Sequence, residues 1–383
     1  MFSKPRRPGA LALTLALLAG VVSIAAPRSR ADAMPIFAQR YHFRCTVCHS
    51  VLPVLNSFGT YFRNHGYRIP KAPVHGTTIA ALRYQLEYET DPPSGQRRWS
   101  PAGVLLSSAN LGNITAYLHY NLGAGGGPSA VYLAYLATYD AHTQMTYRVG
   151  YVELPLMQSP GQRLDDLAPY GYDQTHVGLN NLNLAAPRIG ADVERQVGVA
   201  RIDGTLAFGE YSGSAYGGKP VATGEATYAS RPELGIFTRV PVATGVELFS
   251  DTLLGQRAIG VTGQPVFQDA YQRLGFGADA HYKKLDFQAE QWYGHDGDAD
   301  GVGGQITSSG GYARLRWFPV PHAYLAVRYD AAANPYIVRD WVGYAGVQVY
   351  TMRFILQNVH TIGSGKNYLG GAMTIGFPGP LKY

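Results

Sequence analysis

From residue 76 onward, apolar residues alternate with small or polar residues over segments as long as a β-strand. Each segment is bounded by Gly, Pro, Asn or Asp, the residues that favour turns. A period of two predicts strands, because successive side chains of a strand point to opposite faces of a sheet. We place about sixteen strands at residues 79–89, 104–111, 114–122, 130–139, 144–154, 189–196, 199–208, 225–240, 245–254, 269–282, 285–293, 311–318, 323–329, 341–350, 353–361 and 368–377.

This succession of alternating strands favours a closed β-barrel in a membrane. In such a barrel one face of each strand meets lipid and the other meets the lumen, and closure leaves no unpaired edge in hydrocarbon. An even number of strands is typical of single-chain outer-membrane barrels. The alternative is a secreted β-sandwich or jelly roll, whose core the alternating residues would fill. We predict a mainly β fold, an antiparallel outer-membrane barrel of about sixteen strands at residues 76–383.

The composition agrees with a barrel surrounded by outer-membrane lipid. The chain has 28 Tyr and 46 Gly, and only 15% of its residues are charged. Aromatic residues recur near the predicted strand ends or alternate along the strands, and interface girdles use such residues: Tyr84, Tyr88, Tyr117, Tyr132, Tyr135, Trp292, Tyr293, Trp317, Trp341, Tyr344 and Tyr350. The alternation breaks at residues 155–187, which are rich in Asp, Asn, Gln, Gly and Pro and predict a long loop on one rim.

Residues 1–33 have the pattern of a signal peptide. Lys4, Arg6 and Arg7 precede an apolar run at residues 11–26, and a small-residue cleavage pattern ends at Ala33. We expect cleavage near Ala33 and export to the outer membrane of a Gram-negative bacterium. Five of the basic residues lie in this segment, so the net charge of +6 falls close to zero without it. The charge therefore gives no reason to expect nucleic acid as a partner.

The run Cys45-Thr46-Val47-Cys48-His49 is the attachment signature of a c-type haem. A spacing of three residues puts the two thiols one helical turn apart, where both can reach the haem vinyl groups while the histidine ligates the iron. The chain has no other cysteine, which excludes a four-thiolate zinc site. A redox Cys-x-x-Cys pair is the alternative. We predict one covalent haem c on Cys45 and Cys48, with His49 as an axial ligand of the iron.

The haem signature lies in a short segment, residues 34–75, that we interpret as a monohaem cytochrome c module. Residues 53–67 predict one helix, because Leu55, Phe58, Tyr61 and Phe62 recur at helical spacing and Gly66 favours a stop. His65, at the end of this helix, is a candidate sixth ligand of the haem iron. The alternative is a histidine placed favourably against the helix dipole.

A second candidate metal site lies in a predicted outer loop. Asp296, Asp298 and Asp300 alternate with other residues and precede Gly301, as at the start of a D-x-D-x-D-G calcium loop. Thr307 stands where that loop would have a closing glutamate. A solvated hairpin tip, or a loose cation-collecting loop at the mouth of the barrel, are the alternatives.

The N-terminal segment also resembles a known family over about forty residues. The resemblance rests on Met34-Pro35-Ile36-Phe37-Ala38-Gln39-Arg40-Tyr41, Cys45-Thr46-Val47-Cys48-His49, Pro53, Leu55, Phe58-Gly59, Phe62-Arg63 and Gly66-Tyr67. These residues are similar to those of the monohaem cytochrome c–porin fusions of the outer membrane of iron-oxidising bacteria, the ferrous iron oxidase family. The resemblance implies that extracellular ferrous iron is the electron donor, and that a periplasmic carrier, a cytochrome c or a copper protein, is the acceptor.

Three functions therefore remain open from the sequence. The first is an outer-membrane electron-transfer protein, an iron:cytochrome c oxidoreductase. The second is a porin-like transport barrel with a haem-bearing plug that uses another electron donor. The third is a soluble periplasmic cytochrome c with a β-sandwich.

Overall fold

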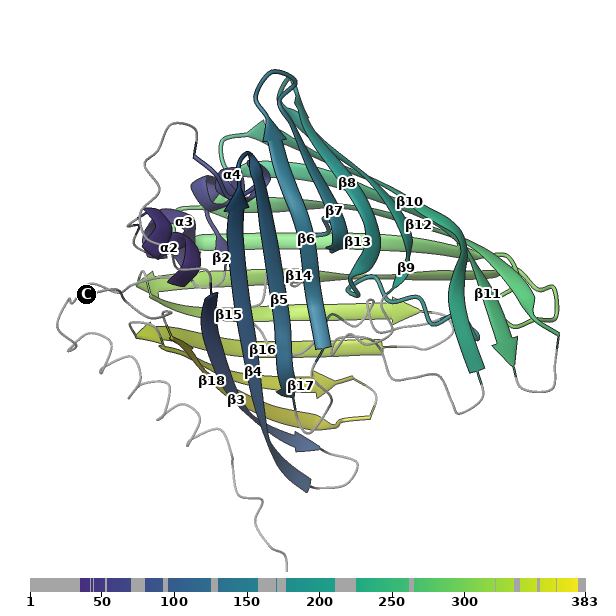
Figure 1. Ribbon diagram of the computed structural model, residues 1–383. Coiled ribbons are helices and arrows are strands. Elements are labelled where there is room, and N and C mark those ends of the chain that lie inside the picture. The colour runs from purple at the N-terminus through teal and green to yellow at the C-terminus, as the bar shows by residue number, and fades with distance from the viewer. Residues whose placement is uncertain are drawn as a thin grey trace, which may run out of the picture.

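The computed structural model describes residues 35–41, 43, 45–51, 54–69, 80–91, 96–124, 130–157, 170, 177–210, 225–261, 265–320, 322–333, 338–349, 352–362 and 364–377. The segment assigned to the signal peptide, residues 1–33, lies outside the described residues. Figure 1 shows one large barrel with a small helical segment at one of its mouths. Among the described residues, no helix has both the length and the apolar character needed to cross a bilayer.

Sixteen antiparallel strands form the barrel, as predicted from the alternation. In chain order they are β3 (Ala80–Asp91), β4 (Gln96–Leu111), β5 (Ile114–Ala124), β6 (Ala130–Asp140), β7 (Met145–Val152), β8 (Arg188–Val197), β9 (Ala200–Glu210), β10 (Glu225–Ala243), β11 (Val246–Val261), β12 (Phe267–Tyr282), β13 (Leu285–Asp296), β14 (Ile306–Val320), β15 (Ala323–Ala333), β16 (Val338–Val349), β17 (Met352–Thr361) and β18 (Asn367–Phe377).

Each strand pairs with its neighbours in the chain, and β18 pairs with β3 to close the sheet. The sandwich alternative is therefore wrong, because its two sheets would have open edges. The main difference from prediction lies at the strand ends. Strand β4 begins at Gln96 rather than at residue 104, and β11 continues to Val261 rather than to residue 254. Each extension contains polar residues, Gln96 to Arg98 and Gln256 to Arg257, which interrupt the apolar alternation on which the predicted ends were based.

The two faces of the wall differ in chemistry. The outer face carries an apolar band that includes Leu136, Val149, Ile236, Leu274 and Leu325, all exposed. The inner face carries many charged side chains that are buried in the lumen. Of the expected girdle residues, four are exposed on the outer face: Tyr84, Tyr293, Trp317 and Trp341. The girdle prediction is wrong for four others, which are buried toward the lumen: Tyr132, Tyr135, Trp292 and Tyr344. Tyr117 is half-buried and stacks on Tyr67.

The two rims of the barrel have connections of different length. At one rim, here called the short-turn rim, hairpins of two to four residues join β4 to β5, β6 to β7, β8 to β9, and so on to β16 and β17. The chain also enters β3 and leaves β18 at this rim. At the opposite, long-loop rim the connections have four to 35 residues, and the longest joins β7 to β8.

This longest connection does not stay at the rim as predicted, but enters the lumen. Its described residues, 153–157, 170 and 177–187, are here called the strap. Leu154, Leu156, Leu182 and Leu184 are buried and pack against lumen side chains of β10, β11, β12 and β13. The rim prediction is wrong because these leucines, dispersed among polar residues, gain the apolar contact that drives folding only inside the barrel.

Asn180 and Tyr170 attach the strap to the wall. The fully buried Asn180 amide donates to the carboxylate of Asp269, 2.7 Å away. The Tyr170 ring lies 4.0 Å from the Arg328 guanidinium and 4.4 Å from the ring of Tyr312. Its hydroxyl accepts a hydrogen bond from Arg314 at 3.2 Å. The strap thus spans the lumen to the far wall, where β14 and β15 hold it.

The N-terminal segment, here called the module, comprises α2 (Pro35–Tyr41), α3 (Cys45–Cys48), β1 (His49–Val51), β2 (Val54–Leu55) and α4 (Ser57–Asn64). The helix predicted at residues 53–67 is shorter than expected. Residues 54–55 instead pair with β1, and Asn56 caps the helix by accepting a hydrogen bond from the Gly59 amide at 2.9 Å. The predicted stop at Gly66 is confirmed, since its φ is +61°.

Candidate haem attachment site and lumen cavity

The haem signature forms a single helical turn. Helix α3 extends from Cys45 to Cys48, and His49 follows as the first residue of β1. The predicted one-turn separation of the two cysteines is therefore present in the backbone. The side chains of Cys48 and His49 are half-buried. A helical turn with two thiols, followed at once by an imidazole, is the donor set that a covalent haem requires, so these residues fit the cofactor.

Close packing on α4 fixes the position of this turn. The Asn56 amide donates to the Cys48 carbonyl at 2.9 Å, and its side-chain amide donates to the Val47 carbonyl at 3.1 Å. Gly59 lies so close to the Cys48 carbonyl that a Cβ atom there would overlap its oxygen. Glycine at this position therefore lets α3 and α4 come together. This explains why α4 has in its interior a residue that usually weakens a helix.

Aromatic side chains join the module to the barrel wall. Phe37 stacks on Tyr67 with ring centroids 4.4 Å apart, and Tyr67 stacks on Tyr117 of β5 at 5.6 Å. The hydroxyls of Tyr67 and Tyr135, which lies on β6, are 3.1 Å apart. Phe62 of α4 is buried in the same cluster. Such ring pairs contribute beyond their buried area, so they hold the module against β3 to β6.

Polar contacts complete this attachment. Arg40 of α2 donates to the backbone carbonyl of Ser108 at 2.8 Å and to the Asn110 side chain at 3.1 Å. Arg63 of α4 lies 3.7 Å from Glu153 at the start of the strap. The Arg68 side chain donates to the carbonyl of Gly112, which lies in a hairpin of the short-turn rim. The module thus occupies part of the barrel mouth at the short-turn rim (Figure 1).

His65, the candidate sixth ligand, is held firmly at the end of α4. Its ring stacks on Tyr61 at 3.7 Å and lies 4.1 Å from the ring of Tyr139. Its Nδ1 lies 2.7 Å from the Tyr61 carbonyl, an acceptor, and so carries the proton. The lone pair is then on Nε2. Histidine ligands of metals typically donate their other ring N–H in this way, so His65 has the tautomer that a metal ligand needs.

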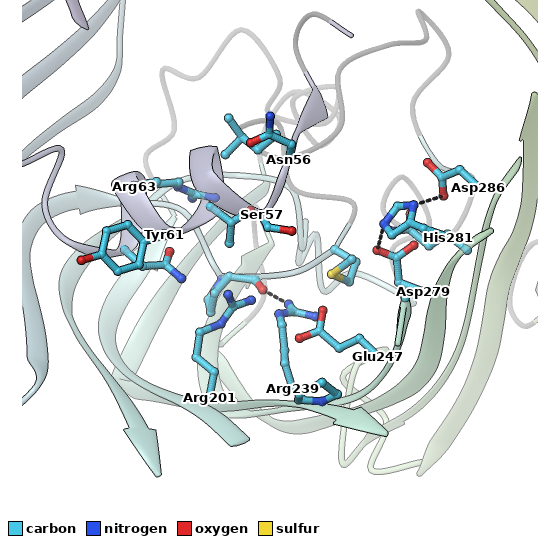
Figure 2. A pocket seen from close by; sticks show the side chains of 18 of the residues that line it. Asn56, Ser57, Tyr61, Arg63, Arg201, Arg239, Glu247, Asp279, His281 and Asp286 are labelled. Atoms are coloured by element: carbon cyan, nitrogen blue, oxygen red, sulfur yellow. Dashed lines mark hydrogen bonds and ion pairs between the residues drawn. The ribbon is translucent and has the colours of Figure 1, made fainter. Parts of the chain in front are cut away.

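A cavity of about 1110 Å³ fills the lumen between α4 and the far wall. Figure 2 shows α4 on one side of it, with Tyr61 and Arg63, and the wall strands on the other. His65 lines the cavity, and so do Pro155 and Met157 of the strap. Cys48 and His49 are not among its lining residues. The cavity is thus bounded by α4, the helix on which the haem signature packs, and not by Cys48 or His49.

Many charged side chains lie in the wall of this cavity. Arg148 of β7 pairs with Asp192 at 2.7 Å and with Glu194 at 2.8 Å, both on β8. Arg239 donates to the carbonyl of Pro155 in the strap (Figure 2). On the opposite side Asp279 and His281 of β12 face Asp286 of β13 (Figure 2). The cavity is therefore a polar compartment in which both signs of charge are available to a solute.

The three aspartates predicted as a cation loop lie at the long-loop rim but are not brought together. Asp296 is fully buried and pairs with Arg273 at 2.9 Å. Asp298 accepts a hydrogen bond from the backbone amide of Gly303, and Asp300 accepts one from that of Val302. These are the hydrogen bonds of a hairpin tip. Among the described residues, one group alone brings three metal-ligating side chains within 4.8 Å of one another: Asp279, His281 and Asp286.

Sequence reasoning missed this group. Asp279 and His281 are two residues apart, so they point to the same face of β12, as the alternation of a strand predicts. Asp286 joins them across the β12–β13 hairpin, where His281 pairs with Asp286 in the register. Finding the group from the sequence would have required the register of this hairpin and the knowledge that this face is the lumen.

The fold and the lumen define a class of protein: a porin-like antiparallel barrel of sixteen strands whose lumen holds a strap and an N-terminal module. The anion-selective porin from Comamonas acidovorans is similar, with a TM-score of 0.54 and 11% identity over 78% of this chain and 98% of that chain. Salmonella typhi OmpF, in a complex with daunomycin, gives a TM-score of 0.54 and 8% identity over 78% and 98%. In-vitro folded OmpT of Vibrio cholerae gives 0.51 and 8% over 79% and 99%. No protein family and no curated protein matches the sequence.

Proposed function

We propose that this chain is an exported outer-membrane barrel that carries one covalent haem c and transfers electrons between a small soluble donor and a periplasmic carrier. One observation carries the proposal: the Cys45–Cys48 turn, which His49 directly follows, is packed on α4, and α4 borders a solute-sized cavity in the lumen. Residues 1–33, with the pattern of a signal peptide, are consistent with export.

The residues that would hold the cofactor are Cys45 and Cys48 through their thiols and His49 through its imidazole. His65 is the candidate for the sixth position, because its tautomer leaves Nε2 able to ligate a metal. When bound, the haem supplies a site that accepts and releases one electron, at a potential set by its axial ligands. The chain holds the haem in a fixed position and provides the polar cavity beside it.

The position of the module bears on how a donor reaches it. Short turns face the periplasm in bacterial outer-membrane barrels, so the short-turn rim and the module belong on the periplasmic side. A periplasmic carrier then reaches the module directly. A donor from outside has to enter at the long-loop rim and pass the strap. This favours a small hydrated ion over a mineral surface, and ferrous iron is the donor that the resemblance to the cytochrome c–porin fusions implies.

The experiment is rapid mixing of the oxidised, haem-loaded, detergent-solubilised protein with ferrous iron. We expect the haem absorbance to change rapidly to that of the reduced form after mixing, because the donor enters the cavity that the module borders. Dithionite serves as the control that the haem is reducible. A haem that dithionite reduces and ferrous iron does not would reject iron as the donor.

A second candidate function, passage of small solutes through the lumen, is favoured by the porin-like fold and by the cavity. The strap and the module narrow this route, so any conductance depends on how firmly the strap is held. Porin-like transport and electron transfer are compatible, because both need solute in the lumen.

Replacing Tyr170 by alanine tests the transport function. The change removes the ring that packs on Arg328 and Tyr312, so we expect the strap to detach from β14 and β15 and the single-channel conductance in planar bilayers to rise. Tyr170→Phe is the control, because it keeps the ring over Arg328 and removes the hydroxyl that accepts a hydrogen bond from Arg314. Equal conductance in Tyr170→Ala and the unmodified protein would mean that the strap does not limit passage.

A further inference from the structure

Asp279, His281 and Asp286 converge on the wall of the cavity opposite α4 (Figure 2). The Nε2 atom of His281 lies 3.4 Å from a carboxylate oxygen of Asp279, and its Nδ1 lies 3.7 Å from a carboxylate oxygen of Asp286. The backbone amide of His281 donates to the Gly245 carbonyl at 2.7 Å, so the neighbouring hairpin fixes this end of β12. The three side chains therefore have a defined mutual position.

Two oxygens of this group lack the hydrogen bonds that buried carboxylates require. Oδ1 of Asp279 and Oδ1 of Asp286 are buried and accept no hydrogen bond from a described residue. The Asp286 side chain is only 3% exposed. An unsatisfied buried acceptor costs free energy, and a bound cation between the carboxylates would supply the missing partner. This observation is independent of the clustering and points to a ligand.

Of the nearby positive charges, Arg316 pairs with Oδ2 of Asp286, a member of the group, whereas Oδ1 of Asp286 accepts no hydrogen bond from a described residue and lies 3.7 Å from Nδ1 of His281. The lysines are directed to other partners. Lys284 donates to the Pro319 carbonyl at 2.8 Å, and the Lys283 ammonium lies over the Tyr282 ring at 5.1 Å. Glu247 adds a carboxylate to the same cavity (Figure 2). The cluster can thus present negative charge to the cavity although arginines and lysines lie close by.

We infer that Asp279, His281 and Asp286 form a binding site for a divalent first-row transition ion. One imidazole nitrogen with carboxylate oxygens suits Fe²⁺, Zn²⁺ or Mn²⁺, whereas Ca²⁺ and Mg²⁺ take oxygen ligands. The exposed side of His281, whose side chain is 58% exposed, opens the site to solute in the cavity. Under the proposed function, on which this last step rests, Fe²⁺ held here is the donor, because the site and α4 border one compartment.

Metal binding is measured separately from electron transfer. The full chain, loaded with haem, is reduced with dithionite and desalted, so that Fe²⁺ has no oxidised haem to react with. Anaerobic equilibrium dialysis against Fe²⁺ should then show one saturable ion per chain, displaced by Zn²⁺ but not by Ca²⁺. Loss of an outer-shell partner of a metal ligand costs roughly 10–100-fold in affinity, so His281→Gln and Asp279→Asn should each weaken binding by at least about 100-fold.

The matched control is His322→Gln, an exposed histidine in the β14–β15 hairpin of the same rim that does not line the cavity. Heat-modifiable migration on gels verifies that each variant is a folded barrel. Absence of saturable binding, or equal binding by all variants, would overturn the site and leave His281 as a bridge between two carboxylates. Saturable binding that His281→Gln abolishes, combined with no reduction of the oxidised haem by Fe²⁺, would uphold the site and reject iron oxidation.

Discussion

Replacing both Cys45 and Cys48 by alanine should abolish covalent haem and leave the barrel folded. The two thiols are the only cysteines of the chain, so no other residue can form a thioether bond. The barrel closes through the pairing of β18 with β3 and does not depend on the module for its edges. Haem staining of denaturing gels should fall from one haem per chain to background, while the heat-modifiable migration of the barrel is kept.

Two further variants separate attachment from ligation. Val47→Ala keeps both thiols and the histidine at their spacing, so haem staining should be unchanged. His49→Ala keeps the thiols but removes the imidazole, so the haem should stay attached with an altered absorbance spectrum. Undiminished staining in the double cysteine variant would contradict the assignment of the c-type attachment signature.

The existence and order of all sixteen strands could be predicted from the sequence. The alternation is a physical requirement of a wall with different solvents on its two faces, and the turns between strands are marked by Gly, Asn and Asp. Strand length could not be predicted as well. Residues 96–103 of β4 contain Arg, Ser and Pro, which carry no β pattern of their own and are held in the sheet by pairing with β3 and β5.

Which face of each strand points to the lumen was harder to predict than the alternation itself. A period of two is unchanged when the faces are exchanged, so aromatic residues such as Trp292 and Tyr135 could not be assigned to lumen or lipid from the pattern. The burial of the strap in the lumen could not be predicted either. Its leucines come as two isolated pairs, Leu154 with Leu156 and Leu182 with Leu184, too short a pattern to predict a buried segment, and only the closed barrel supplies the wall that buries them.

Within the module, the helical turn of the haem signature could be predicted because its spacing is local. The start of α4 could not. The predicted helix begins at residue 53, but the asparagine at position 56 caps the helix, and its side chain also bonds to the turn that carries Cys48. The contacts that residues just after α4 make with β5 and β6 join residues nearly 70 positions apart, such as Tyr67 and Tyr135, and no sequence pattern connects them.

Charge pairing inside the lumen is a general feature of this barrel, and Arg148 is an arginine that faces three carboxylates at once. One guanidinium nitrogen lies 2.7 Å from Asp192 and 3.6 Å from Asp203, and the other lies 2.8 Å from Glu194. All four side chains are buried. Three carboxylates thus share one planar cation, whose fork geometry allows simultaneous bonds to more than one of them.

Replacing Arg148 by alanine should therefore destabilise the barrel strongly. Removing one member of a buried ion pair costs about 3–5 kcal/mol, because the remaining charges stay buried without a partner. The loss should appear as a lower denaturant midpoint for the conversion of the folded to the unfolded gel band. Arg148→Lys keeps the charge but not the fork, so its midpoint should lie between those of Arg148→Ala and the unmodified protein.

Arg195→Ala is the matched control, since Arg195 lies exposed on the neighbouring strand β8 and its loss leaves no buried charge behind. Surface substitutions of this kind change stability by about 0.5 kcal/mol or less. Acidification supplies a second check on the cause. Protonated carboxyl groups need no counter-charge, so the deficit of Arg148→Ala relative to the unmodified protein should shrink as the pH is lowered. A deficit that stays constant with pH would mean that lost packing, rather than unpaired charge, destabilises the variant.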